Sequence, residues 1–245
     1  MNSMQLFLGA CTVLMATTLG AAGVLVFKKI DRRFYATLVA FCAGVMGFSA
    51  LEMINESHAL SGHRMALVSL LVGMIAFLIL DKLMPHAHLI LTGNKMPHVK
   101  RKVALLVGTI TIHNIPEGFA IASAFATSSS LGWLVTLSIA LQDIPEGLVV
   151  AAPVACYGVS TKRSFLWGVF SGVVEFIAAI GGFLLLRTIS NATPLALGFS
   201  GGAMAYVILS ELLPDAMRAE SRFAALAAFI SGIAAAYGFA VLIGF

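Results

Sequence analysis

Charged residues are scarce in this chain. Asp, Glu, Lys and Arg together make up only 11% of the 245 residues, whereas 60% are hydrophobic. The mean hydropathy of +0.98 lies far above that of a water-soluble domain of this length. The scarcity of charge therefore excludes a soluble globular protein and predicts an integral membrane protein.

Cysteines are also few, and no polar stretch is long enough to form a soluble domain. Cys11, Cys42 and Cys156 contain no Cys-x-x-Cys pair, so we interpret them as small buried residues rather than as functional thiols. We expect a single transmembrane domain that comprises residues 1–245.

Apolar runs of about 20 residues, the length that a helix needs to cross about 30 Å of hydrocarbon, recur along the whole chain. The first run has no basic segment before it and is too long for a signal peptide, so we expect it to be retained. The runs predict an all-α polytopic membrane protein with eight transmembrane helices, at about 5–27, 34–54, 65–84, 103–126, 131–153, 165–187, 194–214 and 223–244.

Basic residues are nearly absent from the loops after the second, fourth and sixth predicted helices. Every Lys and Arg except Arg64 and Arg187 falls in or beside the loops after the first, third, fifth and seventh helices. Because cytoplasmic loops collect Lys and Arg, these loops are predicted to be cytoplasmic and both termini to lie outside. This distribution accounts for the excess of basic over acidic residues. We do not expect nucleic acid as a partner, because the basic charges are divided among loops and have no aromatic residues between them.

Two matching blocks place polar side chains inside the fourth and fifth predicted helices. His-Asn-Ile-Pro-Glu-Gly begins at residue 113 and Gln-Asp-Ile-Pro-Glu-Gly at residue 142. Side chains at i and i+4 share one face of a helix, and the short connection makes the two helices antiparallel neighbours. The pattern predicts a metal site built from His113, Asn114, Glu117, Gln142, Asp143 and Glu146.

Both blocks are predicted to lie near the middle of the membrane. At 1.5 Å per residue they lie about 15–23 Å along their helices, and Glu175 of the sixth helix lies about 15 Å along its own. An acid at this depth costs on the order of 2.5–3.5 kcal/mol. Every Lys and Arg except Arg187, whose depth the sequence leaves open, is expected at a helix end or in a loop, too far away to form an ion pair. Protonated acids and a water-filled proton relay are alternatives to bound cations, which we favour.

The ligand types narrow the choice of cation. One imidazole among carboxylates and amide oxygens suits zinc, cadmium, iron or manganese better than calcium or magnesium. Four ionised acids balance the charge of two divalent ions. Pro116 and Pro145 are expected to bend their helices, and Gly118 and Gly147 to admit a close neighbour.

Further acids flank the blocks at i, i+4 spacing. Glu52 and Glu56 end the second helix outside, where we expect them to attract ions, and Glu211 and Asp215 end the seventh helix inside, where we expect ions to leave. The first three and last three helices begin on opposite sides. This relation is typical of an inverted-repeat transporter.

Histidines lie in two predicted loops. His58 and His63 follow the outer acids, where solvated imidazoles and a metal-capturing pair are the alternatives. The cytoplasmic loop 85–102 is either a flexible linker or a weak receiving site for ions through its three histidines, His86, His88 and His98.

The two blocks, with Ser171-Gly172-Val-Val-Glu175 in the sixth helix, resemble the ZIP family of divalent metal transporters (Zrt- and Irt-like proteins), particularly its bacterial GufA-like branch. The resemblance covers the whole chain. It implies import into the cytoplasm across the plasma membrane, a 3+2+3 inverted-repeat bundle, a homodimer and a paired-metal site at the midplane.

The resemblance also assigns the ligands. It implies a first metal at His113, Glu117, Gln142 and Glu146, and a second at Asn114, Asp143 and Glu175, with Glu117 and Glu146 bridging. Met46 either adds a thioether to the first metal or only packs. Many family members have His-Asn where this chain has Gln142-Asp143, which removes one imidazole and adds one negative charge.

We therefore expect a secondary transporter, not an enzyme, that imports zinc or the related ions cadmium, iron and manganese and carries no prosthetic group. The expected partners are the lipid bilayer and a second copy of the chain. An intramembrane metalloenzyme, in which His-x-x-x-Glu ligands activate water, and a metal sensor without transport are the alternatives.

Overall fold

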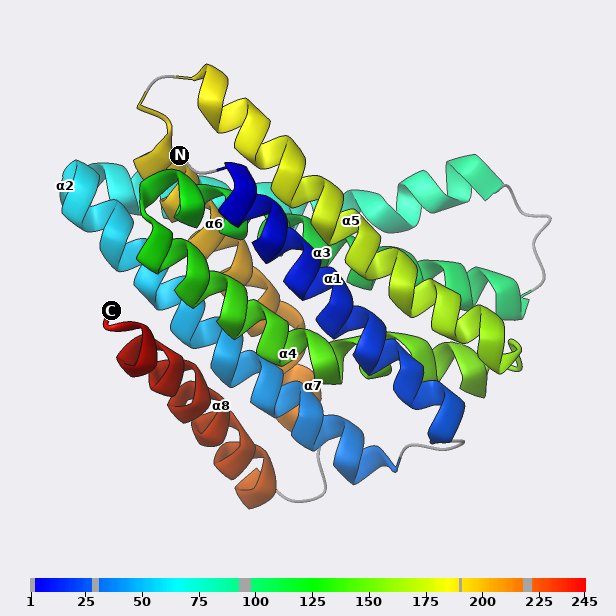
Figure 1. Ribbon diagram of the computed structural model, residues 1–245. Helices are drawn as coiled ribbons and strands as arrows, with labels where there is room; N and C mark the ends of the chain where they lie inside the picture. The colour runs from blue at the N-terminus through cyan, green and yellow to red at the C-terminus, as the bar shows by residue number, and fades with distance from the viewer. Residues whose placement is uncertain (1–2, 28–30, 93–97, 190, 218–221) are drawn as a thin grey trace.

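The computed structural model describes residues 3–27, 31–92, 98–189, 191–217 and 222–245 (Figure 1). Within these residues all regular structure is helical. The elements are α1 (Ser3–Val26), α2 (Arg32–Thr92), α3 (His98–Thr127), α4 (Ser129–Cys156), α5 (Thr161–Thr188), α6 (Thr193–Val207), the π-helical turn η2 (Ile208–Leu212), α7 (Leu213–Met217) and α8 (Arg222–Ile243).

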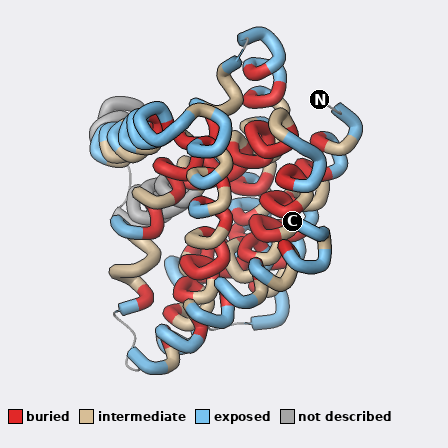
Figure 2. Tube along the Cα trace, turned by 90° about the vertical axis from the view of Figure 1, so that its left-hand side faces the viewer, coloured by how far each residue is buried: buried red, intermediate tan, exposed pale blue. Residues whose placement is uncertain are grey.

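Six helical segments of the described chain are long and apolar enough to cross a membrane. Large apolar side chains such as Leu19, Leu67, Ile177 and Leu242 are exposed on the outside of the bundle, while buried residues gather along its middle (Figure 2). A water-soluble protein does not expose so much apolar surface. The prediction of an all-helical, multi-pass membrane protein is confirmed, and the eight spans in a 3+2+3 arrangement stay a prediction.

The long element α2 contains a break at Gly62. This residue has φ 77° and ψ 167°, a conformation that is essentially restricted to glycine. Figure 1 shows that the chain changes direction where α2 turns cyan. The two spans expected at 34–54 and 65–84 lie on either side of this residue.

The expected loop 85–102 is shorter in the structure, because α2 continues to Thr92 and α3 begins at His98. Pro85, the first residue of the expected loop, does not end the helix, because proline can continue a membrane helix when neighbours satisfy the freed backbone groups. Residues 93–97 and the side chains of His86, His88 and His98 lie outside the described part of the chain.

The helices pack around α3 and α4, which carry the two polar blocks. α1 packs against α4 and α5, α2 runs along α6 and α8, and α3 contacts α4, α5 and α6 (Figure 1). Small residues allow the closest contacts, as at Gly44 of α2, where an added Cβ would overlap the carbonyl oxygen of Phe229 in α8.

Hydrogen bonds join several elements at the end of the bundle that holds Gly62. Ser57 Oγ donates to the carbonyl of Pro194 at 2.7 Å, and Ser129 Oγ donates to Gln5 Oε1 at 2.7 Å. Both ends of the chain lie toward this side (Figure 1). We call this side the Gly62 end. The opposite side, which holds the start of α2 and Asp215, is the Asp215 end.

Candidate metal centre

The two polar blocks meet between α3 and α4. Glu117 of α3 and Asp143 and Glu146 of α4 each place one carboxylate oxygen within 4.8 Å of the others. The Nε2 atom of Gln142 donates a hydrogen bond to Oε1 of Glu117 across the same interface. Asp143 and Glu146 are about one helical turn apart, and Glu117 comes from the neighbouring helix. Their three carboxylates thus converge on one point.

Glu175 joins from α5 and is fully buried. Gly118 follows Glu117 by one residue, and a Cβ added there would overlap the carbonyl oxygen of Glu175. Gly147 has the same relation to the carbonyl oxygen of Thr17 in α1. The close approach predicted at the two glycines is confirmed, and each brings a further helix against the polar blocks.

The side chains of the second predicted ligand set are buried without partners. Both polar atoms of Asn114 and all carboxylate oxygens of Asp143 and Glu175 lack a hydrogen-bond partner among the described residues. Burying an unpaired carboxylate is strongly unfavourable. The structure thus buries these polar oxygens without a hydrogen-bond partner among the described residues.

No Lys or Arg in the described part of the chain pairs with these carboxylates. Arg187 was the one basic residue whose depth the sequence left open. It lies in the last turn of α5, with its guanidinium carbon 6.0 Å from the centre of the Phe183 ring. A structural ion pair therefore does not explain the buried acids, and divalent cations fit the oxygen-rich cluster with its single imidazole.

A cavity of about 210 Å³ leads from the cluster to the Asp215 end. His113, Glu146 and Met46 line its inner part, and Tyr35, Glu211 and Asp215 line the part toward the end of the bundle. Met46 is buried beside the predicted first-metal residues. The pair expected to receive ions, Glu211 and Asp215, therefore borders a continuous space that begins at the predicted ligands.

Glu211 also contacts a predicted ligand directly. Its Oε1 atom lies 3.2 Å from Nε2 of His113. Glu211 belongs to the π-helical turn η2, which precedes Pro214. Proline cannot donate to the carbonyl four residues earlier, and π-helical turns are frequent at functional sites. Helical periodicity does not predict this contact; the position of Pro214 in the sequence is the one signal of an irregular turn here.

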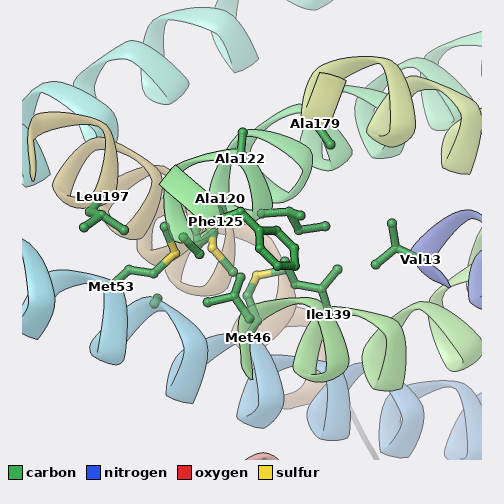
Figure 3. Close-up of a cluster of buried hydrophobic side chains, with 14 of the residues drawn as sticks. Val13, Met46, Met53, Ala120, Ala122, Phe125, Ile139, Ala179 and Leu197 are labelled. Atoms are coloured by element: carbon green, nitrogen blue, oxygen red, sulfur yellow. The ribbon is translucent and has the colours of Figure 1, made fainter. Parts of the chain in front are cut away.

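Apolar side chains close the cluster toward the Gly62 end. Figure 3 shows Met53 of α2, Leu197 of α6, Phe125 of α3 and Ile139 of α4 meeting there, and all are at most 3% exposed. This part of the described bundle belongs to the packed apolar core. The cavity described above borders the cluster on the side of the Asp215 end.

The other predicted residues lie apart from the centre. Glu52 and Glu56 are six and ten residues beyond Met46 along α2, a rise of about 9 and 15 Å toward the Gly62 end, and they do not line the cavity. Among the cysteines, Cys42 is buried as expected and its thiol donates to the carbonyl of Gln142 at 3.5 Å. The interpretation of Cys156 as buried is wrong, because it ends α4 at the surface.

Known proteins are similar to this chain in sequence. Zinc transporter GufA of Myxococcus xanthus is 34% identical over 217 residues, which cover 83% of this chain and 85% of that protein. Zinc transporter ZIPB of Bordetella bronchiseptica is 33% identical over 240 residues, 93% of this chain and 77% of that protein. A longer relative from Arabidopsis thaliana is 28% identical over 213 residues, and the chain spans about a third, 34%, of its length.

Residues 92–244, which include both polar blocks and Glu175, match the ZIP zinc transporter family. This match covers more than half of the chain, and the bacterial relatives extend the similarity over most of the remainder. The chain belongs to the ZIP family.

Proposed function

We propose that this protein is a secondary transporter that imports zinc, and the related ions cadmium, iron and manganese, into the cytoplasm. Membership of a family whose relatives are named zinc transporters supports divalent metal transport rather than enzymatic activity. The observation that carries the proposal is the buried cluster of Glu117, Asp143 and Glu146, without a basic partner among the described residues.

The proposed site binds two ions between α3, α4 and α5. The first is held by His113, Glu117, Gln142 and Glu146, with the thioether of Met46 beside them, and the second by Asn114, Asp143 and Glu175. The cavity supports this division, because His113, Glu146 and Met46 border it, whereas Asn114, Asp143 and Glu175 are at most 1% exposed. The first ion would then exchange with solution more readily than the second.

The Asp215 end is proposed to face the cytoplasm. Lys162 and Arg163 begin α5 and Arg222 begins α8, and basic residues of short loops favour the cytoplasmic side. With α2 counted as two spans separated at Gly62, the chain crosses the plasma membrane eight times in a 3+2+3 inverted-repeat bundle with both termini outside. We further propose that two such chains form a homodimer.

Transport through this site requires a second conformation. In the described structure the apolar side chains around Met53 and Leu197 close the Gly62 end. Ions attracted by Glu52 and Glu56 can reach the centre only after α3 and α4 move relative to the surrounding helices. Glu211 and Asp215 then receive the ion on the open side.

Metal uptake into reconstituted vesicles tests the proposal. The combined variant Glu117→Ala and Glu146→Ala is expected to lose uptake of zinc and of the competing ions, while Ser210→Ala, an exposed hydroxyl position, retains it. Uptake by the double variant equal to that of the parent would show that the site assignment is wrong. Saturable zinc binding by the parent without any flux would identify a sensor instead.

A further inference from the structure

Two histidines of α2 meet at the Gly62 break. They lie apart from the carboxylate cluster, which belongs to α3 and α4. His58 precedes the break and His63 follows it directly, and both side chains are exposed. Their Nε2 atoms are 3.3 Å apart, and their rings are stacked with centroids 4.0 Å apart and planes inclined by 30°.

A hydrogen bond joins the two imidazoles, with the Nε2 atom of one ring as donor and that of the other as acceptor. The 3.3 Å separation is longer than the usual N–H···acceptor distance of about 2.9–3.0 Å, so this bond is weak and a metal ion can replace its proton.

The separation matches the spacing of two ligands on one metal ion. Two nitrogens at about 2.0–2.1 Å from a tetrahedral zinc ion are about 3.3–3.4 Å from each other. The ring planes must open further for both lone pairs to meet at one point. The χ2 torsion of histidine is broad, and exposed rings turn without displacing a packed neighbour.

We propose that His58 and His63 form a binding site for one divalent transition-metal ion at the Gly62 end, separate from the buried cluster. Two neutral imidazoles suit zinc, copper and nickel. Asn55 lies three residues before His58 on the same face of the helix and is exposed, so its amide oxygen is available as a third ligand and water completes the shell.

The bound ion would connect the two halves of α2. A residue in the helix before Gly62 and a residue in the helix after it would share one ion, and Gly62 itself has open space around the position of an added Cβ. The angle between the two halves would then depend on metal at this end of the bundle. The acids Glu52 and Glu56 are partly buried, so this site does not rely on them.

Zinc binding measured by equilibrium dialysis on the purified full chain tests the site. The background carries Glu117→Ala, Glu146→Ala, His86→Ala, His88→Ala and His98→Ala, so that the midplane cluster and the other loop histidines do not contribute. We expect one zinc ion per chain in this background. His58→Ala or His63→Ala should weaken its binding at least about tenfold, which corresponds to about 1.4 kcal/mol.

Leu60→Ala is the matched control, because Leu60 is exposed between the two histidines and offers no ligand atom; it should bind as the background does. Pulsed electron paramagnetic resonance with copper should show two coordinated imidazoles, and one after either histidine is replaced. Should the background chain fail to fold, the same substitutions in the parent chain must lower the zinc stoichiometry by one.

Unchanged zinc binding and an unchanged copper spectrum in both histidine variants would overturn the proposal. That outcome is distinct from a failure of the proposed transport function, because binding at His58 and His63 is measured without flux and in a chain that lacks the bridging residues Glu117 and Glu146.

Discussion

The Nε2 atom of His113 lies 3.2 Å from Oε1 of Glu211, so the imidazole of the first polar block contacts the π-helical turn on the open side of the cluster. If His113 holds the first ion through this nitrogen, as proposed, the nitrogen cannot contact Glu211 at the same time. The imidazole would then release the ion to the cavity by exchanging it for Glu211.

Glu211→Gln is expected to slow zinc release. The neutral amide competes less well than a carboxylate for the His113 ring and attracts a departing cation less strongly. Zinc uptake into vesicles should fall about tenfold, equivalent to about 1.4 kcal/mol in the barrier, while the number of bound ions is kept. Leu209→Ala, at an exposed neighbouring position, should transport normally. Equal release rates in Glu211→Gln and the parent would contradict the exchange.

Asp143→Asn is expected to stabilise the metal-free protein and to remove one bound ion. The carboxylate is 1% exposed and both oxygens lack partners among the described residues, so the isosteric amide lowers the cost of burial by on the order of 1 kcal/mol. Thermal unfolding in detergent without metal should shift upward. The stabilisation that zinc adds should shrink, because a ligand stabilises only the state that binds it.

The measurement pairs thermal unfolding with metal analysis of the purified protein, and Glu175→Gln should behave in the same way. A lower unfolding temperature for metal-free Asp143→Asn than for the metal-free parent would show that the buried carboxylate does not destabilise the metal-free protein.

Gly118→Ala is expected to destabilise the protein by about 1–3 kcal/mol, the usual effect of overpacking. Its Cβ would overlap the backbone of Glu175, so α3 and α5 would have to separate. Gly181→Ala in α5 is the control, because nothing lies within 4 Å of an added Cβ there and alanine favours a helix. Thermal unfolding and zinc stoichiometry provide the readouts; a Gly118→Ala protein as stable as Gly181→Ala would refute the close packing.

Tyr206→Phe is expected to loosen α2 against α6. The Tyr206 hydroxyl donates to Oδ2 of Asp81 at 2.9 Å, and such hydrogen bonds between membrane helices contribute about 0.6 kcal/mol on average. Amide hydrogen exchange in the second half of α2 should become faster. Tyr237→Phe is the control, because the ring of Tyr237 packs edge-on against Phe48, and it should leave the exchange unchanged. Identical exchange in both variants would show that the hydrogen bond between Tyr206 and Asp81 does not stabilise the contact between α2 and α6.

The cluster of Glu117, Asp143 and Glu146 follows closely from the sequence. Side chains four residues apart share a helix face, the short connection after Thr127 makes α3 and α4 antiparallel, and counting residues brings both blocks to one depth. Each step depends on local geometry or on the membrane thickness. These are constraints that a sequence expresses directly.

The contact between His113 and Glu211 could not be derived in this way. It depends on a π-helical turn and on the packing of α6 and η2 against α2 and α3, which no periodicity records. The end of α2 at Thr92 and the exposure of Cys156 likewise follow from tertiary surroundings. Local rules describe one helix at a time and leave such relations between helices undetermined.

The one-ended cavity makes the two membrane faces inequivalent for any reagent that cannot cross the bilayer. A chelator or a competing ion added on the side of Tyr35 and Asp215 meets His113 and Glu146 through open space. Toward the opposite face, the packed side chains around Met53 and Leu197 follow the cluster. A reagent would therefore reach the proposed ions more readily from one compartment than from the other, and the side from which it acts reports which way the described conformation faces.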